Sequence, residues 1–244
     1  TVRNIFLQQL ARGNSLTRGR DGTGHYADPA HRIYGNVSHL GAMIPLAAGV
    51  ALALSIRKEG SVVMNYIGDG GSSTGEFHEG LNMAAVMQLP FILIIENNQF
   101  AYSTPSRKQY AAQKLSDRAA GYGIPGVTID GTNVALVYET CRKAVDRARR
   151  GEGPTLIESV TMRMHGHSAS DDASYVPEGM VDDWRKRDPI DRLEKILLAD
   201  HILNEQAQKN IEGRIASEIE DAVGFATGSE YPPAEDAGEG VYAP

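Results

Sequence analysis

Two short polar clusters in the sequence carry residue types that can bind a divalent cation beside an anion. The first is Gly68-Asp69-Gly70-Gly71, in which a carboxylate stands among glycines that let the backbone approach a ligand closely. The second is Asn97-Asn98, and Asn98 follows Asp69 by 29 residues. Carboxylate, amide and backbone carbonyl oxygens are hard ligands that suit Mg²⁺. Alternatively, the two clusters could be ordinary turns without a ligand, since glycine and asparagine are common in turns. The spacing between Asp69 and Asn98 favours a metal site over that alternative.

The two clusters follow apolar segments that the sequence predicts to be parallel strands. Residues 91–95 are apolar throughout, and residues 62–67 are apolar apart from Asn65, which is typical of strands covered on both faces. Residues 74–88 between them carry apolar side chains at helical spacing. This strand–helix–strand unit is long enough for one crossover, so Asp69 and Asn98 are expected at neighbouring strand ends.

The rest of the chain continues the alternation of strands and helices. We expect helices at 42–57, 135–150, 191–198 and 204–223, strands at 127–130 and 155–162, and loops at 12–41 and 165–177. This pattern predicts an α/β fold with a doubly wound, mostly parallel sheet and helices on both faces. Ligands of such folds bind beyond the carboxyl ends of the strands. We expect one α/β domain over residues 1–223 and an extended acidic tail over residues 224–244.

The composition excludes several classes of protein. The 244 residues are long enough to bury a sizeable core, and a net charge of −7 gives no overall basic footprint for nucleic acid. No segment reaches the roughly 18 to 20 apolar residues of a membrane span. The single cysteine, Cys141, has no internal disulfide partner, which favours a reducing interior. The chain opens at Thr1 in mid-pattern, so we expect a polypeptide trimmed at its N-terminus.

The residues around both clusters resemble one known family. The chain strongly resembles the α subunit of the thiamine diphosphate-dependent dehydrogenase component of 2-oxo acid dehydrogenase complexes. The resemblance is carried by GDGGSSTGEFHEGLNMAAVMQLPFILIIENNQFAYSTP, by GNVSHLGAMIPLAAGVALA before it, and by RMHGHSASDDASY and DPIDRLEKILL after it. It covers nearly the whole chain and implies the thiamine diphosphate-binding fold.

The resemblance implies a role for each matching position. Mg²⁺ would be bound by the side chains of Asp69 and Asn98 and the carbonyl of Phe100. Cofactor contacts would come from Ser38, Leu40, Gly68, Asp69, Gly70, Gly71, Asn98, Arg163 and His167. His167 would be the catalytic histidine near the reacting carbon of the cofactor, with His165 a second one in the same loop. Ser168 matches a position that is phosphorylated in mitochondrial relatives, and we do not carry that regulation over.

The resemblance also implies partners. In this family the glutamate that activates the cofactor lies on a β subunit, and a Tyr-Arg pair that holds the diphosphate lies upstream of the matching region. We therefore expect an α2β2 heterotetramer, with no activity from this chain alone. It would decarboxylate a 2-oxo acid and pass the acyl group to the lipoyl group of an acyltransferase. Neither nucleic acid nor membrane is expected as a partner, and a cytoplasmic location is favoured over the mitochondrial matrix.

Several alternatives stay open from the sequence. The segment FHEGLNMAAVMQLP resembles pyruvate or acetoin enzymes, whereas SASDDASY and the Ser38/Leu40 pair resemble branched-chain enzymes. Acetoin dehydrogenase is the near alternative. More distant ones are a transketolase-like half, which the HGHS loop disfavours, and a non-catalytic module that binds magnesium and a diphosphate. A zinc site at His165 and His167 is disfavoured because no cysteine lies nearby. The pair Asp171-Asp172 is expected to order its loop.

Overall fold

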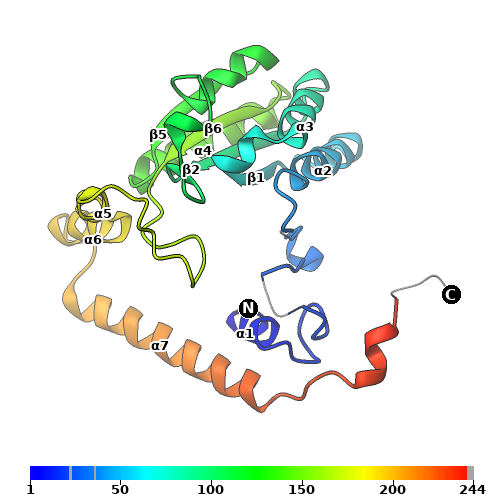
Figure 1. The fold of residues 1–244 in the computed structure, drawn as a ribbon, viewed down its shortest axis with the longest axis vertical. Coiled ribbons are helices and arrows are strands. Elements are labelled where there is room, and N and C mark those ends of the chain that lie inside the picture. Colours follow the sequence, from blue (N-terminus) through cyan, green and yellow to red (C-terminus); the bar gives the residue numbers. More distant parts are fainter. Residues whose placement is uncertain (22–23, 36, 241–244) are drawn as a thin grey trace. The chain divides into compact units, whose positions relative to one another are not determined.

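The computed structural model describes residues 1–21, 24–35 and 37–240, whose elements are labelled in Figure 1. The chain divides into two compact units. One comprises Thr1–Ser38 together with Leu198–Pro244, and the other comprises His39–Leu197. Both polar clusters lie in the second unit, which we call the sheet unit.

The sheet unit is built on four parallel strands in the order β1-β2-β6-β5. The strands are β1 (Val63–Gly68), β2 (Phe91–Asn97), β5 (Gly126–Asp130) and β6 (Thr155–Val160). In the register, Gly68 of β1 is paired with Glu96 of β2, and Glu96 is paired with Ser159 of β6. The carboxyl ends of three neighbouring strands therefore lie in line, which is where the polar clusters begin.

Helices cover both faces of this sheet (Figure 1). The helices α2 (Met43–Arg57) and α3 (Gly75–Val86) pack on one face, and α4 (Val134–Arg149) packs on the other. The connections β1–α3–β2 and β5–α4–β6 cross the sheet in opposite directions. Right-handed crossovers in opposite directions place their helices on opposite faces. The predicted α/β fold with a doubly wound parallel sheet is confirmed.

The core explains why residues 91–95 of β2 are all apolar. Its side chains alternate between the two faces, so Phe91, Leu93 and Ile95 join the core under α2 and α3. Ile92 and Ile94 join the core under α4. A strand that is buried on both faces has no solvent side on which a polar residue would be favoured.

The sheet unit also contains elements that the sequence analysis did not predict. They are the 3-10 helices η2 (Gly70–Ser73), η3 (Ser106–Lys108) and η4 (Leu115–Tyr122), the antiparallel pair β3 (Phe100–Ala101) and β4 (Thr104–Pro105), and α5 (Met180–Arg185). Helix α6 (Pro189–Ala199) begins two residues before its predicted start. Strand β6 ends at Val160, two residues before its predicted end, because the chain leaves the sheet there.

The other unit pairs the start of the chain with its end. Helix α1 (Val2–Gln9), which was not predicted, packs against α7 (Glu205–Gly228), and Arg3 bonds Asp221 at 2.8 Å. The short 3-10 helices η1 (Pro29–His31) and η5 (Ala234–Gly238) complete it. Asn204 caps α7, since its side chain accepts a hydrogen bond from the Ala207 N–H. Helix α7 continues to Gly228, past the boundary that was expected after residue 223. The division into an α/β domain over residues 1–223 and a tail over residues 224–244 stays a prediction.

Candidate active site

Asp69 is the first residue after β1, and it is almost fully buried at 1% exposure. One carboxylate oxygen, Oδ2, accepts a hydrogen bond from Gln109 Nε2 at 2.7 Å. Burial raises the pKa of Asp69, and hydrogen bonds from Gln109 and from the backbone of Gly70 and Asn98 counter part of that rise. A buried carboxylate with no cationic side chain among these partners is a site that a divalent cation would stabilise.

Two of the three glycines of the first cluster, Gly70 and Gly71, are closely packed against neighbouring side chains. A Cβ on Gly70 would stand 2.6 Å from the Ala101 Cβ, and one on Gly71 would stand 2.5 Å from the Ile67 Cδ1. Both distances are shorter than any van der Waals contact between carbons, so larger residues would displace their neighbours. Leu40 also packs here, with its Cβ 3.7 Å from the position of a Cβ on Gly71. The η2 backbone is thereby held directly beside Asp69.

The two asparagines after β2 have different surroundings. Asn97 is buried in the sheet, and its Nδ2 donates to Glu158 Oε1 at 2.7 Å. Asn98 lies beyond the strand, and its Oδ1 accepts a hydrogen bond from the Phe100 N–H at 3.2 Å. Its backbone N–H donates to the Glu96 carbonyl at 2.9 Å and also lowers the pKa of the nearby Asp69 carboxylate. The structure therefore brings the backbone of Asn98 to Asp69, while the Asn98 side chain closes the turn into β3.

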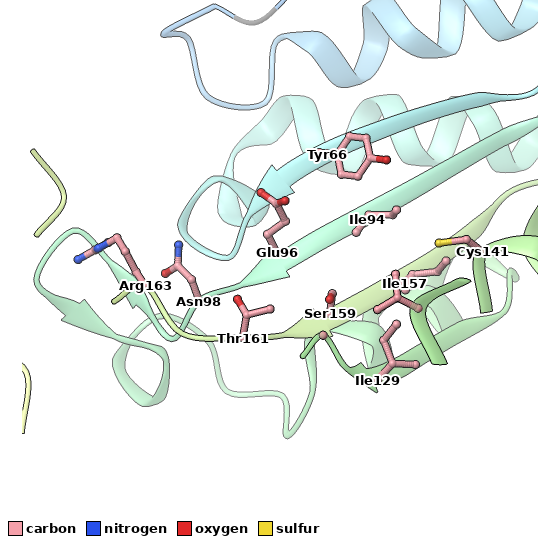
Figure 2. Close-up of a pocket in the computed structure, with 12 residues that line it drawn as sticks. Tyr66, Ile94, Glu96, Asn98, Ile129, Cys141, Ile157, Ser159, Thr161 and Arg163 are labelled. Carbon is pink, nitrogen blue, oxygen red and sulfur yellow. The ribbon is translucent and has the colours of Figure 1, made fainter. Parts of the chain in front are cut away.

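Arg163 ties the loop after β6 to the β3–β4 hairpin. Its guanidinium donates to the carbonyl of Phe100 at 3.2 Å and to the carbonyl of Tyr102 at 2.7 Å. It also donates to the Tyr175 hydroxyl at 2.6 Å. The Phe100 carbonyl, the proposed third magnesium ligand, therefore accepts a hydrogen bond from Arg163 here. Figure 2 shows Arg163 and Asn98 at the same end of the sheet.

The histidine loop is ordered by Asp171, as the sequence predicts for the Asp171-Asp172 pair. Asp171 Oδ2 accepts hydrogen bonds from the His167 N–H and from the Tyr175 hydroxyl, each at 2.6 Å. These donors lower the pKa of Asp171, with the Tyr175 hydroxyl the largest cause. The His167 ring stands edge-on to Tyr102, with centroids 4.9 Å apart, and the His165 carbonyl accepts from Arg163. His167 is thus linked to the hairpin that Arg163 contacts.

The remaining site residues fall into different parts of the structure. Gly68 ends β1 and Leu40 packs beside Gly71, both in the sheet unit. Ser38 is the last residue of the other unit's first segment, where its hydroxyl lies 2.8 Å from His25 Nε2. Leu40 therefore lies beside the glycine cluster. For Ser38 the structure shows a contact with His25 within its own unit.

A pocket of about 410 Å³ opens on the α4 side of the sheet (Figure 2). Its wall is mainly apolar, with Tyr66, Ile94, Ile129, Val137, Cys141 and Ile157. Asn98, Thr161 and Arg163 also line it, so it adjoins the candidate site. Sequence reasoning missed this pocket, although alternate residues of β2 and β6 point to one face of a sheet and could have indicated it.

The reactivity of Cys141, which lines this pocket, tests how far its thiol is buried. Burial raises the pKa of the Cys141 thiol, and only the thiolate reacts with alkylating reagents. We expect the rate of alkylation by iodoacetamide to keep rising above pH 8.5, the ordinary cysteine pKa being about 8.5. The rate is measured by mass spectrometry between pH 7 and pH 10, with Cys141→Ser as the unlabelled control. A rate that levels off by about pH 8 would contradict the burial of the thiol.

Sequence reasoning also missed two polar residues that support the site. Gln109 bonds Asp69 from 40 residues away. Glu158, at 2% exposure, accepts hydrogen bonds from Asn97 and from the Thr128 hydroxyl and the Ser116 N–H. Neither residue stands in a recognisable motif, so only their contacts in the fold reveal them.

Comparison with known proteins decides the family. The model of the dehydrogenase E1 component family matches residues 1–235. The chain belongs to the dehydrogenase E1 component family. The α subunit of 2-oxoisovalerate dehydrogenase from Bacillus subtilis is 38% identical over the whole chain and 74% of that relative. The α subunit of acetoin:2,6-dichlorophenolindophenol oxidoreductase from the same organism is 36% identical, over 93% of this chain and 68% of its own length.

A third E1 relative shows how much of these proteins the chain spans. The α subunit of the pyruvate dehydrogenase E1 component from Staphylococcus aureus is 42% identical over 78% of this chain and 52% of its own length. The chain thus spans between about half and three quarters of the three relatives. All three are oxidoreductases by name, and all three are α subunits. The predicted resemblance to this E1 family is confirmed.

The oxygen atoms around Asp69 are of the kinds that bind a magnesium ion. Asp69 offers a buried carboxylate, and Gln109 Oε1 is a buried oxygen that has no hydrogen-bond partner within the described residues. No cluster of three or more histidine, cysteine, aspartate or glutamate side chains with metal-site geometry occurs in the described part of the chain. A cation here would thus be held by one carboxylate together with amide, carbonyl and water oxygens, a set that suits Mg²⁺. Among the same residues, no helix has the length and apolar character to cross a bilayer.

Proposed function

We propose that this chain is the α subunit of a thiamine diphosphate-dependent 2-oxo acid dehydrogenase that works with a β subunit in an α2β2 heterotetramer. The observation that carries the proposal is the buried Asp69 carboxylate, held beside the backbone of Asn98 at the ends of two neighbouring strands. E1 family membership supports the cofactor, since the family depends in general on thiamine diphosphate. The relatives' names as α subunits support the β partner.

The proposed roles follow from where these groups lie. Asp69, the Asn98 side chain and the Phe100 carbonyl would hold Mg²⁺, and the N–H groups of Gly70 and Gly71 would face the diphosphate. Arg163 would supply positive charge to that diphosphate, exchanging its hydrogen bond to the Phe100 carbonyl for a phosphate oxygen. The remaining cofactor contacts that we propose are Ser38, Leu40 and Gly68, together with His167.

Thiamine diphosphate, when bound, supplies the electron sink for decarboxylation of a 2-oxo acid. The residues of this chain would bind and orient the reactants, which lowers the entropic part of the barrier. His167 would move a proton during transfer of the acyl group to the lipoyl group of an acyltransferase partner, with His165 assisting from the same loop. Asp171 holds the His167 backbone and so fixes the loop in which both histidines lie.

The proposed substrate is a branched-chain 2-oxo acid or pyruvate. The relative matched over the largest share of its own length among the three is named for 2-oxoisovalerate. Acetoin is the second candidate, because the acetoin-oxidising relative is 36% identical over 93% of the chain. The bacterial origin of all three relatives supports a cytoplasmic location.

A binding and activity experiment tests the proposal. Calorimetric titration with thiamine diphosphate and Mg²⁺ is carried out on the chain alone and on the chain with a candidate β subunit. We expect magnesium-dependent binding in the assembly, and decarboxylation of 2-oxoisovalerate or pyruvate only when β is present. Turnover of acetoin in place of both acids would favour the second candidate. Absence of binding in the verified assembly would overturn the proposal.

Substituting His167 tests its catalytic role. General acid–base groups contribute about 10²- to 10⁴-fold to rate, so His167→Ala should reduce the activity of the full complex by that order. The measurement is kcat with the lipoyl-bearing acyltransferase present. Glu178→Ala, an exposed change later in the same loop, should leave kcat unchanged. Full complex activity in His167→Ala would remove this residue from the mechanism.

A further inference from the structure

Gln109 donates through its side-chain amide nitrogen to two acceptors from different parts of the chain. Its Nε2 donates to Asp69 Oδ2 at 2.7 Å and to the Thr104 carbonyl at 3.0 Å. An amide NH₂ has two hydrogens, so these two bonds use both of them. The reverse orientation would set the amide oxygen against a carboxylate and a carbonyl, both of which only accept. The orientation of the amide is therefore fixed by its neighbours.

That orientation leaves the amide oxygen without a partner. Gln109 Oε1 is buried, and no donor reaches it within the described residues. Buried polar atoms in proteins are nearly always hydrogen-bonded, so such an exception calls for a missing group. The group must be a hydrogen-bond donor and must lie close to the Asp69 carboxylate, because the same amide bonds that carboxylate.

The loop that carries Gln109 is itself anchored to the strand ends. The Gln109 N–H donates to the Ser106 carbonyl at 3.0 Å, and the Ser106 N–H donates to the Gln99 carbonyl at 2.9 Å. The next residue, Tyr110, accepts a hydrogen bond from Asn97 Nδ2 at 3.2 Å. These bonds hold Gln109 in register with β2, so its approach to Asp69 is built into the fold.

We propose that Gln109 is a positioning residue for the cation site, a role that rests on the proposed function of Asp69 as a magnesium ligand. Its Nε2 orients the Asp69 carboxylate, and its Oε1 accepts a hydrogen bond from a water molecule of the bound cation. Mg²⁺ usually keeps several of its waters in proteins, and a metal-bound water is a strong donor. Residues that orient metal ligands in this way commonly affect metal affinity about 10- to 100-fold.

Binding of Mn²⁺ in the presence of thiamine diphosphate tests the proposal without any activity measurement. Free Mn²⁺ is counted by electron paramagnetic resonance for the α–β assembly, with the native chain and with Gln109→Met. Methionine has a similar length and no amide, so the Mn²⁺ dissociation constant should rise about 10- to 100-fold. The cation-free Gln109→Met protein should still unfold cooperatively, at a somewhat lower temperature, because Asp69 and the Thr104 carbonyl lose a hydrogen-bond donor.

Control variants distinguish the positioning role of Gln109 from the proposed binding of the cation and thiamine diphosphate. Gln113→Met, an exposed change in the same loop, should bind Mn²⁺ like the native protein. Gln109→Asn keeps the amide on a shorter side chain and should lose affinity as well, which provides a second variant if Gln109→Met does not fold. Native affinity in either Gln109 variant would overturn the positioning role alone. Absence of Mn²⁺ binding by the native assembly would overturn the proposed function and this role together.

Discussion

Asp69→Asn should abolish magnesium-dependent binding of thiamine diphosphate and leave the ligand-free fold at least as stable as before. Asparagine keeps the shape of the side chain and an oxygen for Gln109, but it removes the charge that would hold the cation. Substituting a residue that hydrogen-bonds to a metal ligand already lowers the metal affinity about 10- to 100-fold. Removing the carboxylate ligand itself should therefore lower the Mg²⁺ affinity by more than about 100-fold. Calorimetric titration with thiamine diphosphate, with and without Mg²⁺, measures the effect.

The stability part of this result follows from the direction of the Asp69 pKa. Burial raises that pKa, so the ionised carboxylate is disfavoured in the ligand-free fold. A raised carboxyl pKa contributes stability below its unfolded value, and that contribution is lost as the pH rises through the folded value. At neutral pH the charge therefore opposes folding, and asparagine relieves it. Asp182→Asn, an exposed control, should change neither property. Unchanged magnesium-dependent binding of thiamine diphosphate by Asp69→Asn would contradict the assignment of Asp69 as a magnesium ligand.

Glu158→Leu should lower the free energy of unfolding by about 3–5 kcal/mol. Glu158 is buried, and its carboxylate accepts hydrogen bonds from Asn97, Ser116 and Thr128. Leucine would remove the acceptor of all three donors, although Asn97 Nδ2 keeps the Tyr110 hydroxyl and the Thr128 hydroxyl keeps that of Ser116. Each lost hydrogen bond costs about 1–3 kcal/mol, partly offset by removing a buried charge. Urea titration followed by circular dichroism measures the loss.

Glu158→Gln provides the matched control. It keeps the length of the side chain and one oxygen acceptor, so the loss should be smaller, about 1 kcal/mol. Equal losses in the two variants would show that the retained oxygen acceptor of glutamine contributes nothing to the stability here. Because Asn97 precedes Asn98, Glu158→Leu should also loosen the turn that presents Asn98.

The strands beside the site were predictable because burial on both faces leaves a local signal. Residues 62–67 and 91–95 were expected, and β1 and β2 cover Val63–Gly68 and Phe91–Asn97. A mainly apolar run that stops at a polar residue or a glycine needs no distant information to be recognised. The spacing of Asp69 and Asn98 then predicted neighbouring strand ends, as the parallel β1–β2 register confirms.

Features that depend on distant packing were not predictable. The sequence analysis expected a helix that ends at residue 223, yet α7 continues through Gly224 to Gly228. Ala222 and Ala226 on either side are buried, and packing of α7 against α1 offsets the roughly 1 kcal/mol cost of a helical glycine. The same limit applies to Gln109 and Glu158, whose partners lie 40 and 61 residues away in the sequence.

The strand order also bears on how the chain is made. Strand β6 is the last of the four to leave the ribosome, yet it lies between β2 and β5. Until Val160 has been synthesised, β2 has an open edge and β5 has no neighbour in the sheet. Nascent chains shorter than this therefore expose unpaired apolar strand edges, which are prone to aggregate. We expect ribosome-bound chains that stop before Thr155 to need chaperone protection, and those long enough for β6 to have left the ribosome to need much less.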